Sequence, residues 1–78
     1  MPKIKIYSTP TCPYCHMVKE YLKEHKFTFE DLNVAEDAKA RNEMVEKTQQ
    51  MGVPVVDIDG NIVIGFDKPV IDKILDIK

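Results

Sequence analysis

The first 33 residues change their hydrophobic period twice, and this change constrains the fold more than any other feature of the chain. Residues 3–8 alternate between polar and apolar side chains, which predicts a strand with one buried face. Residues 13–25 place apolar side chains at helical spacing, and residues 27–33 alternate again. Because strand, helix and strand follow in this order, the sequence predicts a parallel strand pair joined by a right-handed crossover.

The rest of the chain predicts a helix, a hairpin and a last helix. Residues 36–50 are rich in helix formers, and we expect Gly52 to end that helix. Asp59-Gly60 separates two short apolar runs, which predicts a hairpin with a type I′ turn because both central residues need positive φ. We expect Asp67 to cap the last helix. The apolar stripe of that helix consists of Val70, Ile71, Ile74 and Leu75.

The predicted order of elements is β-α-β-α-β-β-α, which is typical of the α/β class. The simplest arrangement is a four-stranded mixed sheet with helices on both faces. A chain of 78 residues leaves no room for two domains, so we expect residues 1–78 to form one.

The composition excludes several classes of protein. Hydrophobic residues make up 44% of the chain and charged residues 31%, which argues against disorder. The net charge of -2 gives no electrostatic basis for binding nucleic acid. The N-terminus lacks the apolar core of a signal peptide, and no apolar stretch approaches the about 20 residues of a membrane helix. We therefore expect a cytoplasmic monomer without membrane or nucleic-acid partners.

The two cysteines lie in the motif Cys12-Pro13-Tyr14-Cys15, between the first predicted strand and the first predicted helix. A C-x-x-C motif in this context indicates a redox-active pair. A helix N-terminus favours a thiolate, so we expect Cys12 to be the exposed nucleophile. Cys15 follows one turn deeper on the same side, and it would resolve the mixed disulfide that Cys12 forms with a substrate.

Other interpretations of the cysteine pair fit the sequence less well. A structural zinc site needs about four ligands, and His16 and His25 do not complete a familiar spacing. The C-x-x-C-H pattern that ends at His16 matches covalent haem attachment, but that chemistry normally accompanies export. Two incidental buried cysteines are the remaining interpretation. We expect no metal at these residues.

Three segments of the chain resemble the glutaredoxin family. Residues 7–15 look like the active-site segment of dithiol glutaredoxins, which carry C-P-Y-C. Residues 53–56 resemble the segment of the thioredoxin superfamily that contains a cis-proline, and residues 65–67 fall where glutaredoxins have a Gly-Gly-x-Asp-like turn. The resemblance covers essentially the whole chain. It implies a thioredoxin fold and a thiol–disulfide oxidoreductase that reduces protein disulfides or glutathione mixed disulfides.

The resemblance also implies roles for individual residues. Tyr14 would flank the substrate sulfur, and Val53 would offer its backbone N–H and C=O to an extended cysteinyl ligand. Pro54 would be cis and would turn that backbone toward the nucleophile. Asp67 and the backbone around Phe66 would hold the γ-glutamyl end of glutathione. Glutathione would be the cosubstrate, and the resemblance implies no directly bound metal or nucleotide.

Two departures from the family pattern leave the electron donor open. Thr9 stands where glutaredoxins often have a lysine or arginine that meets the glycine carboxylate of glutathione, and Phe66 replaces the second glycine of the late turn. In its Gly65-Phe66 pair and its short length, the chain resembles the NrdH-redoxins. Those proteins take electrons from thioredoxin reductase. The alternative is therefore an NrdH-like hydrogen donor, for example to ribonucleotide reductase. The lysines that could replace the missing cation are Lys5, Lys19, Lys47 and Lys68.

An iron–sulfur or metal carrier that uses Cys12 together with glutathione is an alternative from a different class. Soft thiolates suit such clusters. The motif suits disulfide formation better than cluster binding, because it has Pro13 and Tyr14 between the cysteines and a second thiol at Cys15.

Overall fold

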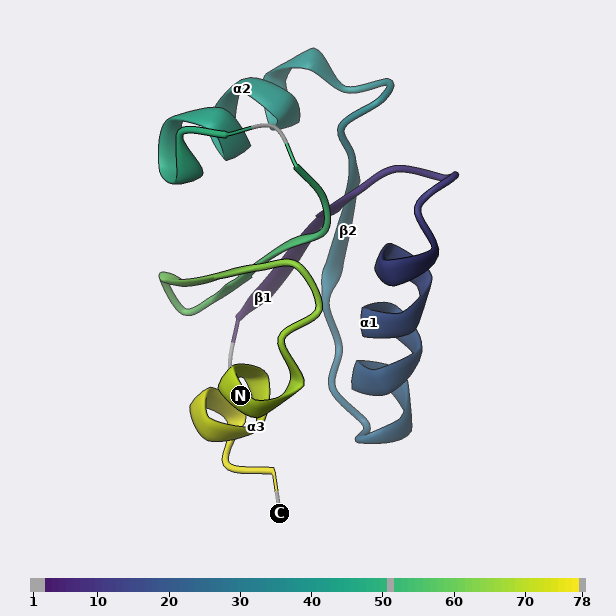
Figure 1. Ribbon diagram of the computed structural model, residues 1–78, viewed down its shortest axis with the longest axis vertical. Coiled ribbons are helices and arrows are strands. Elements are labelled where there is room, and N and C mark those ends of the chain that lie inside the picture. The colour runs from purple at the N-terminus through teal and green to yellow at the C-terminus, as the bar shows by residue number, and fades with distance from the viewer. Residues whose placement is uncertain (1–2, 51, 78) are drawn as a thin grey trace.

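The structure, a computed structural model that describes residues 3–50 and 52–77, has the predicted order of elements (Figure 1). These elements are β1 (Ile4–Ser8), α1 (Pro13–Glu24), β2 (Glu30–Asn33), α2 (Ala38–Thr48), β3 (Val55–Ile58), β4 (Asn61–Ile64) and α3 (Lys68–Leu75). None of the helices in the described part of the chain is long and apolar enough to cross a membrane.

The four strands form one mixed sheet, as predicted, and their order in the sheet is β2-β1-β3-β4. β1 runs parallel to β2 and antiparallel to β3, and β3 and β4 form the hairpin. Tyr7 of β1 is therefore opposite Leu32 on one side and Val55 on the other. β2 begins at Glu30, later than the alternating pattern of residues 27–33 predicts.

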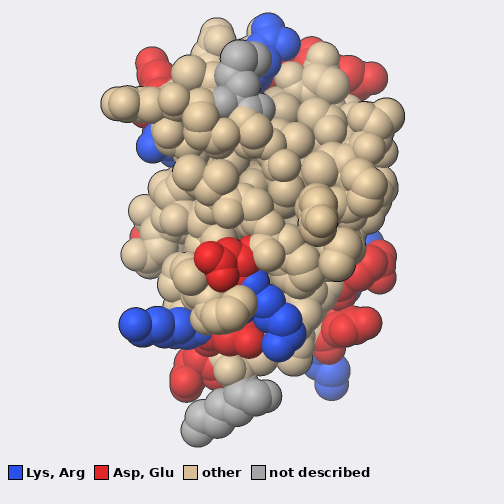
Figure 2. Space-filling model, in the orientation of Figure 1, with Lys and Arg blue, Asp and Glu red and all other residues tan. Residues whose placement is uncertain are grey.

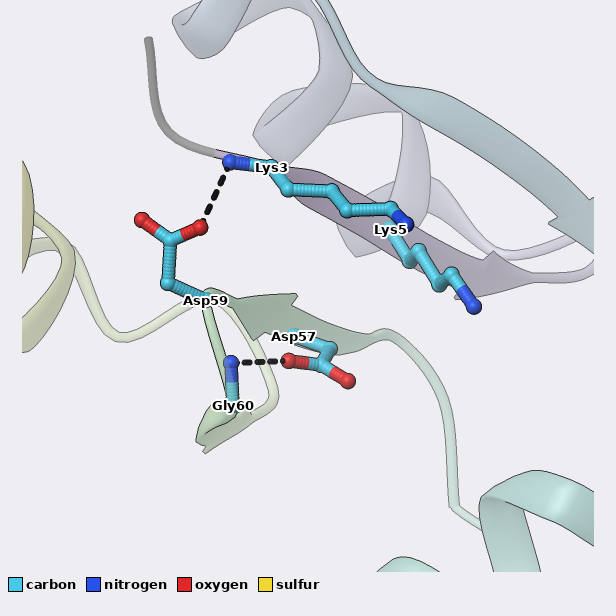
Figure 3. A pocket seen from close by; sticks show the side chains of 5 residues that line it. All are labelled: Lys3, Lys5, Asp57, Asp59 and Gly60. Carbon is cyan, nitrogen blue, oxygen red and sulfur yellow. Dashed lines mark hydrogen bonds between the residues drawn. The ribbon is translucent and has the colours of Figure 1, made fainter.

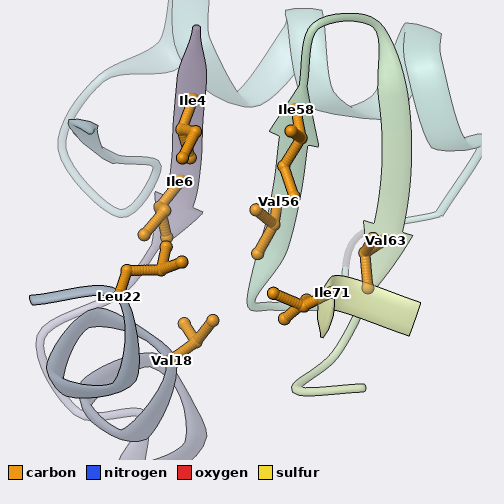
Figure 4. Packing of buried hydrophobic residues seen from close by; sticks show 8 residues of the cluster. All are labelled: Ile4, Ile6, Val18, Leu22, Val56, Ile58, Val63 and Ile71. Carbon is orange, nitrogen blue, oxygen red and sulfur yellow. The ribbon is translucent and has the colours of Figure 1, made fainter. Parts of the chain in front are cut away.

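Helices cover both faces of the sheet, and this confirms the predicted layers. On one face, α1 and α3 pack on the sheet around an apolar cluster, which Figure 4 shows in detail. Strand alternation sends Ile6 to this face and Tyr7 to the opposite face, where α2 lies. The cluster beneath α1 and α3 consists of Ile4, Ile6, Val18, Leu22, Val56, Ile58, Val63 and Ile71.

A partly buried polar network supplements the apolar contacts between α2 and the sheet. The Tyr7 hydroxyl donates to Glu43 (2.5 Å), and Lys47 Nζ donates to the Tyr7 hydroxyl (3.0 Å) and to Asp57 (2.7 Å). The hydrogen bonds from Tyr7 and Lys47 lower the pKa of Glu43 to about 2. Burial acts to lower the pKa of Lys47, but hydrogen bonds to Asp57, Tyr7 and Glu43 outweigh it and raise that pKa. Lys47 is therefore a fixed structural cation.

The boundaries of α2 differ from the prediction at both ends. The helix begins just after Asp37, whose side chain accepts a hydrogen bond from the Ala40 N–H (3.1 Å) and so acts as the N-cap. It ends at Gln49, which adopts a left-handed conformation with φ of 56°. The prediction that Gly52 ends this helix is therefore wrong, because a non-glycine residue takes the left-handed position earlier in the chain.

The hairpin turn follows the prediction, whereas the last helix departs from it. Asp59 and Gly60 both have positive φ (51° and 92°), as a type I′ turn requires. Asp67 occupies the N-cap position of α3, but its side chain makes no capping hydrogen bond. Pro69, in the first turn, lacks one of the N–H groups that such a cap would use. Val70 is 39% exposed and lies outside the buried stripe.

Charged side chains are unevenly distributed over the surface of the molecule. In the orientation of Figure 1, a wide area across the middle of the molecule carries few charged side chains (Figure 2). Acidic and basic side chains lie close together in the lower part of the same view, where α3 is found.

Candidate active site

Cys12 lies where β1 has ended and α1 begins. It is the N-cap residue of α1, with φ of -93° and ψ of 112°, and Pro13 is the first helical residue. The Cys12 N–H donates to the Thr9 carbonyl oxygen (3.4 Å), which closes the turn between strand and helix. The side chain of Cys12 is partly exposed. The thiol therefore meets solvent at the end of the helix where backbone N–H groups lack intrahelical partners.

Cys15 is fully buried one turn further along the same helix. Burial, followed by hydrogen bonding with Cys12, raises the pKa of the Cys15 thiol to about 11. At neutral pH, Cys15 is consequently a protonated thiol that solvent does not reach. The two cysteines of the motif are thus clearly different in accessibility.

The Val53–Pro54 segment faces Cys12 from the start of β3. The peptide bond between Val53 and Pro54 is cis, as predicted. The Cys12 thiol donates to the Val53 carbonyl oxygen at 3.8 Å, a normal distance for a sulfur donor. The Gly65 N–H donates to the Pro54 carbonyl oxygen (2.7 Å), so the turn before α3 is tied to the same segment. Three separate parts of the sequence therefore meet at one end of the sheet.

The other predicted site residues adjoin these segments in the sequence and differ in exposure. Tyr14 is 61% exposed in the first turn of α1. Phe66 is half-buried, and its ring packs against Tyr21 with a centroid distance of 5.7 Å. Asp67 is exposed at the start of α3. Their roles in substrate binding remain predictions.

The lysines that could replace the cation missing at Thr9 all form ion pairs. Lys19 is the one nearest in sequence to the cysteines, and its ammonium lies 2.9 Å from Asp31, which also accepts a hydrogen bond from Ser8. Burial acts to raise the pKa of Asp31, but hydrogen bonds from Lys19 and Ser8 outweigh it and lower that pKa. The other pairs are Lys5 with Glu43 (3.5 Å), Lys47 with Asp57 (2.7 Å) and Lys68 with Asp72 (3.3 Å).

Gln50 holds the backbone just before Val53, a role that the sequence did not indicate. Its Nε2 donates to the Gly52 carbonyl oxygen (3.1 Å) and to Thr48 Oγ1 (3.3 Å). Its Oε1 accepts from the Gly52 N–H (2.6 Å). The side-chain amide thus fixes Gly52 on both sides and connects it to the end of α2. This arrangement depends on how the chain folds back on itself, which periodicity does not reveal.

A small hollow at the opposite end of the sheet offers no second reactive centre. It is lined by two lysines at the start of β1 and by residues of the β3–β4 hairpin, namely Lys3, Lys5, Asp57, Asp59 and Gly60 (Figure 3). Asp59 accepts from the Lys3 backbone N–H (2.8 Å), and Asp57 accepts from the Gly60 N–H (2.9 Å). These carboxylates stabilise the hairpin. Within residues 3–50 and 52–77, no three His, Cys, Asp or Glu side chains are grouped so that they could hold a metal ion.

Comparison with known proteins identifies the family. Residues 4–63 match the family model described as Glutaredoxin. The chain belongs to the glutaredoxin family. A glutaredoxin-like 8.6 kDa protein from the rubredoxin operon of Clostridium pasteurianum is 58% identical over 73 residues, which cover 94% of this chain and 97% of that protein. The glutaredoxin-like protein NrdH of Lactococcus lactis strain IL1403 is 36% identical, over 81% of this chain and 86% of its own.

Solved structures agree with this family assignment. The crystal structure of a point mutant of the thioredoxin-like protein BC3987 superposes with a TM-score of 0.92 and 38% identity, and the match covers 100% of both chains. The fold is therefore a thioredoxin fold. With its two nearby cysteines, this glutaredoxin family member is a thiol–disulfide oxidoreductase.

The positioning of Val53 by Gln50 leads to a prediction. Gln50→Met keeps the length of the side chain but removes both hydrogen bonds to Gly52, so the backbone at Val53 becomes less well placed. We expect KM for a disulfide substrate to rise at least about threefold with a smaller change in kcat. Steady-state kinetics measures this change.

Gln50→Glu is the matched control, because its carboxylate still accepts from the Gly52 N–H but no longer donates to the Gly52 carbonyl. It should give an intermediate KM. If both variants bind substrate as the unmodified chain does, Gln50 does not position Val53.

Proposed function

We propose that Cys12 is the nucleophile and Cys15 the resolving thiol of a two-thiol reduction of disulfides. The difference in exposure between the two sulfurs supports this assignment most strongly, since Cys12 is partly exposed and Cys15 is fully buried. A helix N-terminus stabilises negative charge on the attacking sulfur. A buried, protonated Cys15 does not compete for the substrate.

The reaction proceeds by two exchanges. The Cys12 thiolate attacks one sulfur of the substrate disulfide, and the other sulfur leaves as a thiolate. Cys15 then attacks the Cys12 sulfur of the mixed disulfide, its proton passes to the departing thiolate, and the second substrate thiol is released. The substrate has gained two electrons, and the protein now holds a Cys12–Cys15 disulfide.

We propose that the substrate lies between the first turn of α1 and the Val53–Pro54 segment. The hydrogen bond of Cys12 with the Val53 carbonyl supports this location, because an extended ligand joined to Cys12 would run beside the same backbone. Tyr14 would flank the substrate sulfur. Asp67 uses none of its side-chain oxygens to cap α3, and its exposed carboxylate would be free to accept the ammonium of a γ-glutamyl group.

We propose glutathione as the reductant that regenerates the dithiol, with protein disulfides or glutathione mixed disulfides as substrates in the cytoplasm. The match to the glutaredoxin model and the exposed carboxylate of Asp67 support this choice. A second candidate is an NrdH-like hydrogen donor reduced by thioredoxin reductase. The ion pairs of Lys5, Lys19, Lys47 and Lys68 favour it, because they occupy the cations considered for the glycine carboxylate of glutathione.

Cysteine variants test the assignment of the two thiols. Cys12→Ser should reduce turnover of a protein disulfide to background, because no accessible thiol remains. Cys15→Ser should stop after the first exchange and accumulate a mixed disulfide, which peptide mapping by mass spectrometry would locate at Cys12. Turnover by Cys12→Ser, or an adduct at Cys15 in that variant, contradicts the assignment.

The choice of electron donor is tested with the oxidised protein and two reducing systems. One contains NADPH, glutathione and glutathione reductase, and the other contains NADPH and thioredoxin reductase. We expect the first system to regenerate the dithiol faster, as measured by NADPH consumption. Efficient regeneration by thioredoxin reductase alone would assign the chain to the NrdH-like alternative.

A further inference from the structure

A shallow groove lies between α1 and the start of α3, and it begins at His16, one turn after Cys12. Its apolar surface comes from Met17 and Tyr21 of α1 and from Phe66 of the turn before α3. Met17 is 48% exposed, although it is a large hydrophobic residue. The groove has a volume of about 460 Å³. Met17, Tyr21 and Phe66 together offer an apolar surface that a side chain of a partner could cover.

The charged residues that line this groove leave it acidic. Lys68 forms an ion pair with Asp72 (3.3 Å), and its Nζ lies 5.4 Å from the centre of the Tyr21 ring. Glu20 and Glu24, by contrast, form no ion pair with any residue in 3–50 or 52–77. These two glutamates are four residues apart on α1 and therefore lie on the same side of the helix. An apolar surface flanked by these two carboxylates is complementary to a segment that carries an apolar and a cationic side chain.

We propose that this groove binds a basic segment of the partner protein whose disulfide Cys12 attacks. The proposal rests on the proposed function, because the partner must first place its disulfide at Cys12. The groove then selects partners with an apolar side chain and a lysine or arginine near the attacked cysteine. Glutathione does not satisfy this chemistry, because it is an anionic tripeptide.

The geometry of α1 sets the spacing expected in the partner. At a rise of 1.5 Å per residue, Glu20 and Glu24 lie about 12 and 18 Å along the helix from Cys12. An extended chain advances about 3.3 Å per residue. The cation of the partner should therefore lie about four to six residues from the cysteine that is attacked.

Two synthetic peptides test this selection. Both contain the same mixed disulfide and a leucine, and they differ only in having lysine or glutamate five residues from the cysteine. At low salt, the reduced protein should reduce the lysine peptide with a kcat/KM about three- to tenfold higher than that for the glutamate peptide. This is the size expected when one lysine forms exposed charge pairs with Glu20 and Glu24. The preference should shrink at high salt, because screening weakens exposed pairs. Hydroxyethyl disulfide, which is small and uncharged, serves as the reference for each protein variant.

The double variant Glu20→Lys/Glu24→Lys should reverse the preference. The matched control is Glu30→Lys/Glu46→Lys, which changes net charge equally at exposed residues of β2 and α2 that form no ion pair with the described residues. It should keep the preference for the lysine peptide.

The outcomes separate this proposal from the proposed function. If the unmodified protein reduces the reference disulfide but does not distinguish the peptides at low salt, the groove does not select partners. The same conclusion follows if both double variants shift the preference equally. If the protein does not reduce even the reference disulfide, the proposed function itself is wrong.

Discussion

The antiparallel pairing of β1 with β3 is the constraint on which the site depends. It places Tyr7 opposite Val55, so the end of β1 lies beside the start of β3. The chain that leaves β1 reaches Cys12, and the chain that enters β3 comes from the cis Pro54. Two segments that are about forty residues apart therefore meet, and the Cys12 thiol contacts the Val53 carbonyl at 3.8 Å. A single strand pairing therefore brings the Cys12 thiol beside the Val53 backbone, where we propose that a ligand binds.

The amphipathic pattern of α1 then gives the two cysteines different exposures. Cys15, Val18 and Leu22 share one face of the helix, and all three are fully buried against the sheet. The spacing that builds the apolar core thus also removes Cys15 from solvent and raises its pKa. Cys12 precedes this face at the helix end and stays partly exposed. Packing of the core and the difference in exposure between the two thiols have the same physical cause.

Local patterns in the sequence predicted the elements, the Asp59-Gly60 turn and the position of Cys12 at the start of a helix. The cis peptide at Pro54 was predicted from the resemblance to a family. The partners of Lys19 and Lys47 and the double hydrogen bond of Gln50 to Gly52 were not predictable, because these contacts depend on how separate elements pack. The end of α2 was misplaced because Gln49 adopts a left-handed conformation that glycine was expected to supply.

Burial, and not only the order of the motif, distinguishes the two thiols. Alkylation of the reduced protein with limiting iodoacetamide, followed by peptide mapping over a range of pH, measures the reaction of each sulfur directly. We expect Cys12 to be modified first at neutral pH. We expect Cys15 to react only at strongly alkaline pH, since its pKa is about 11. If Cys15 is modified at the same rate as Cys12 at neutral pH, burial does not distinguish the two thiols.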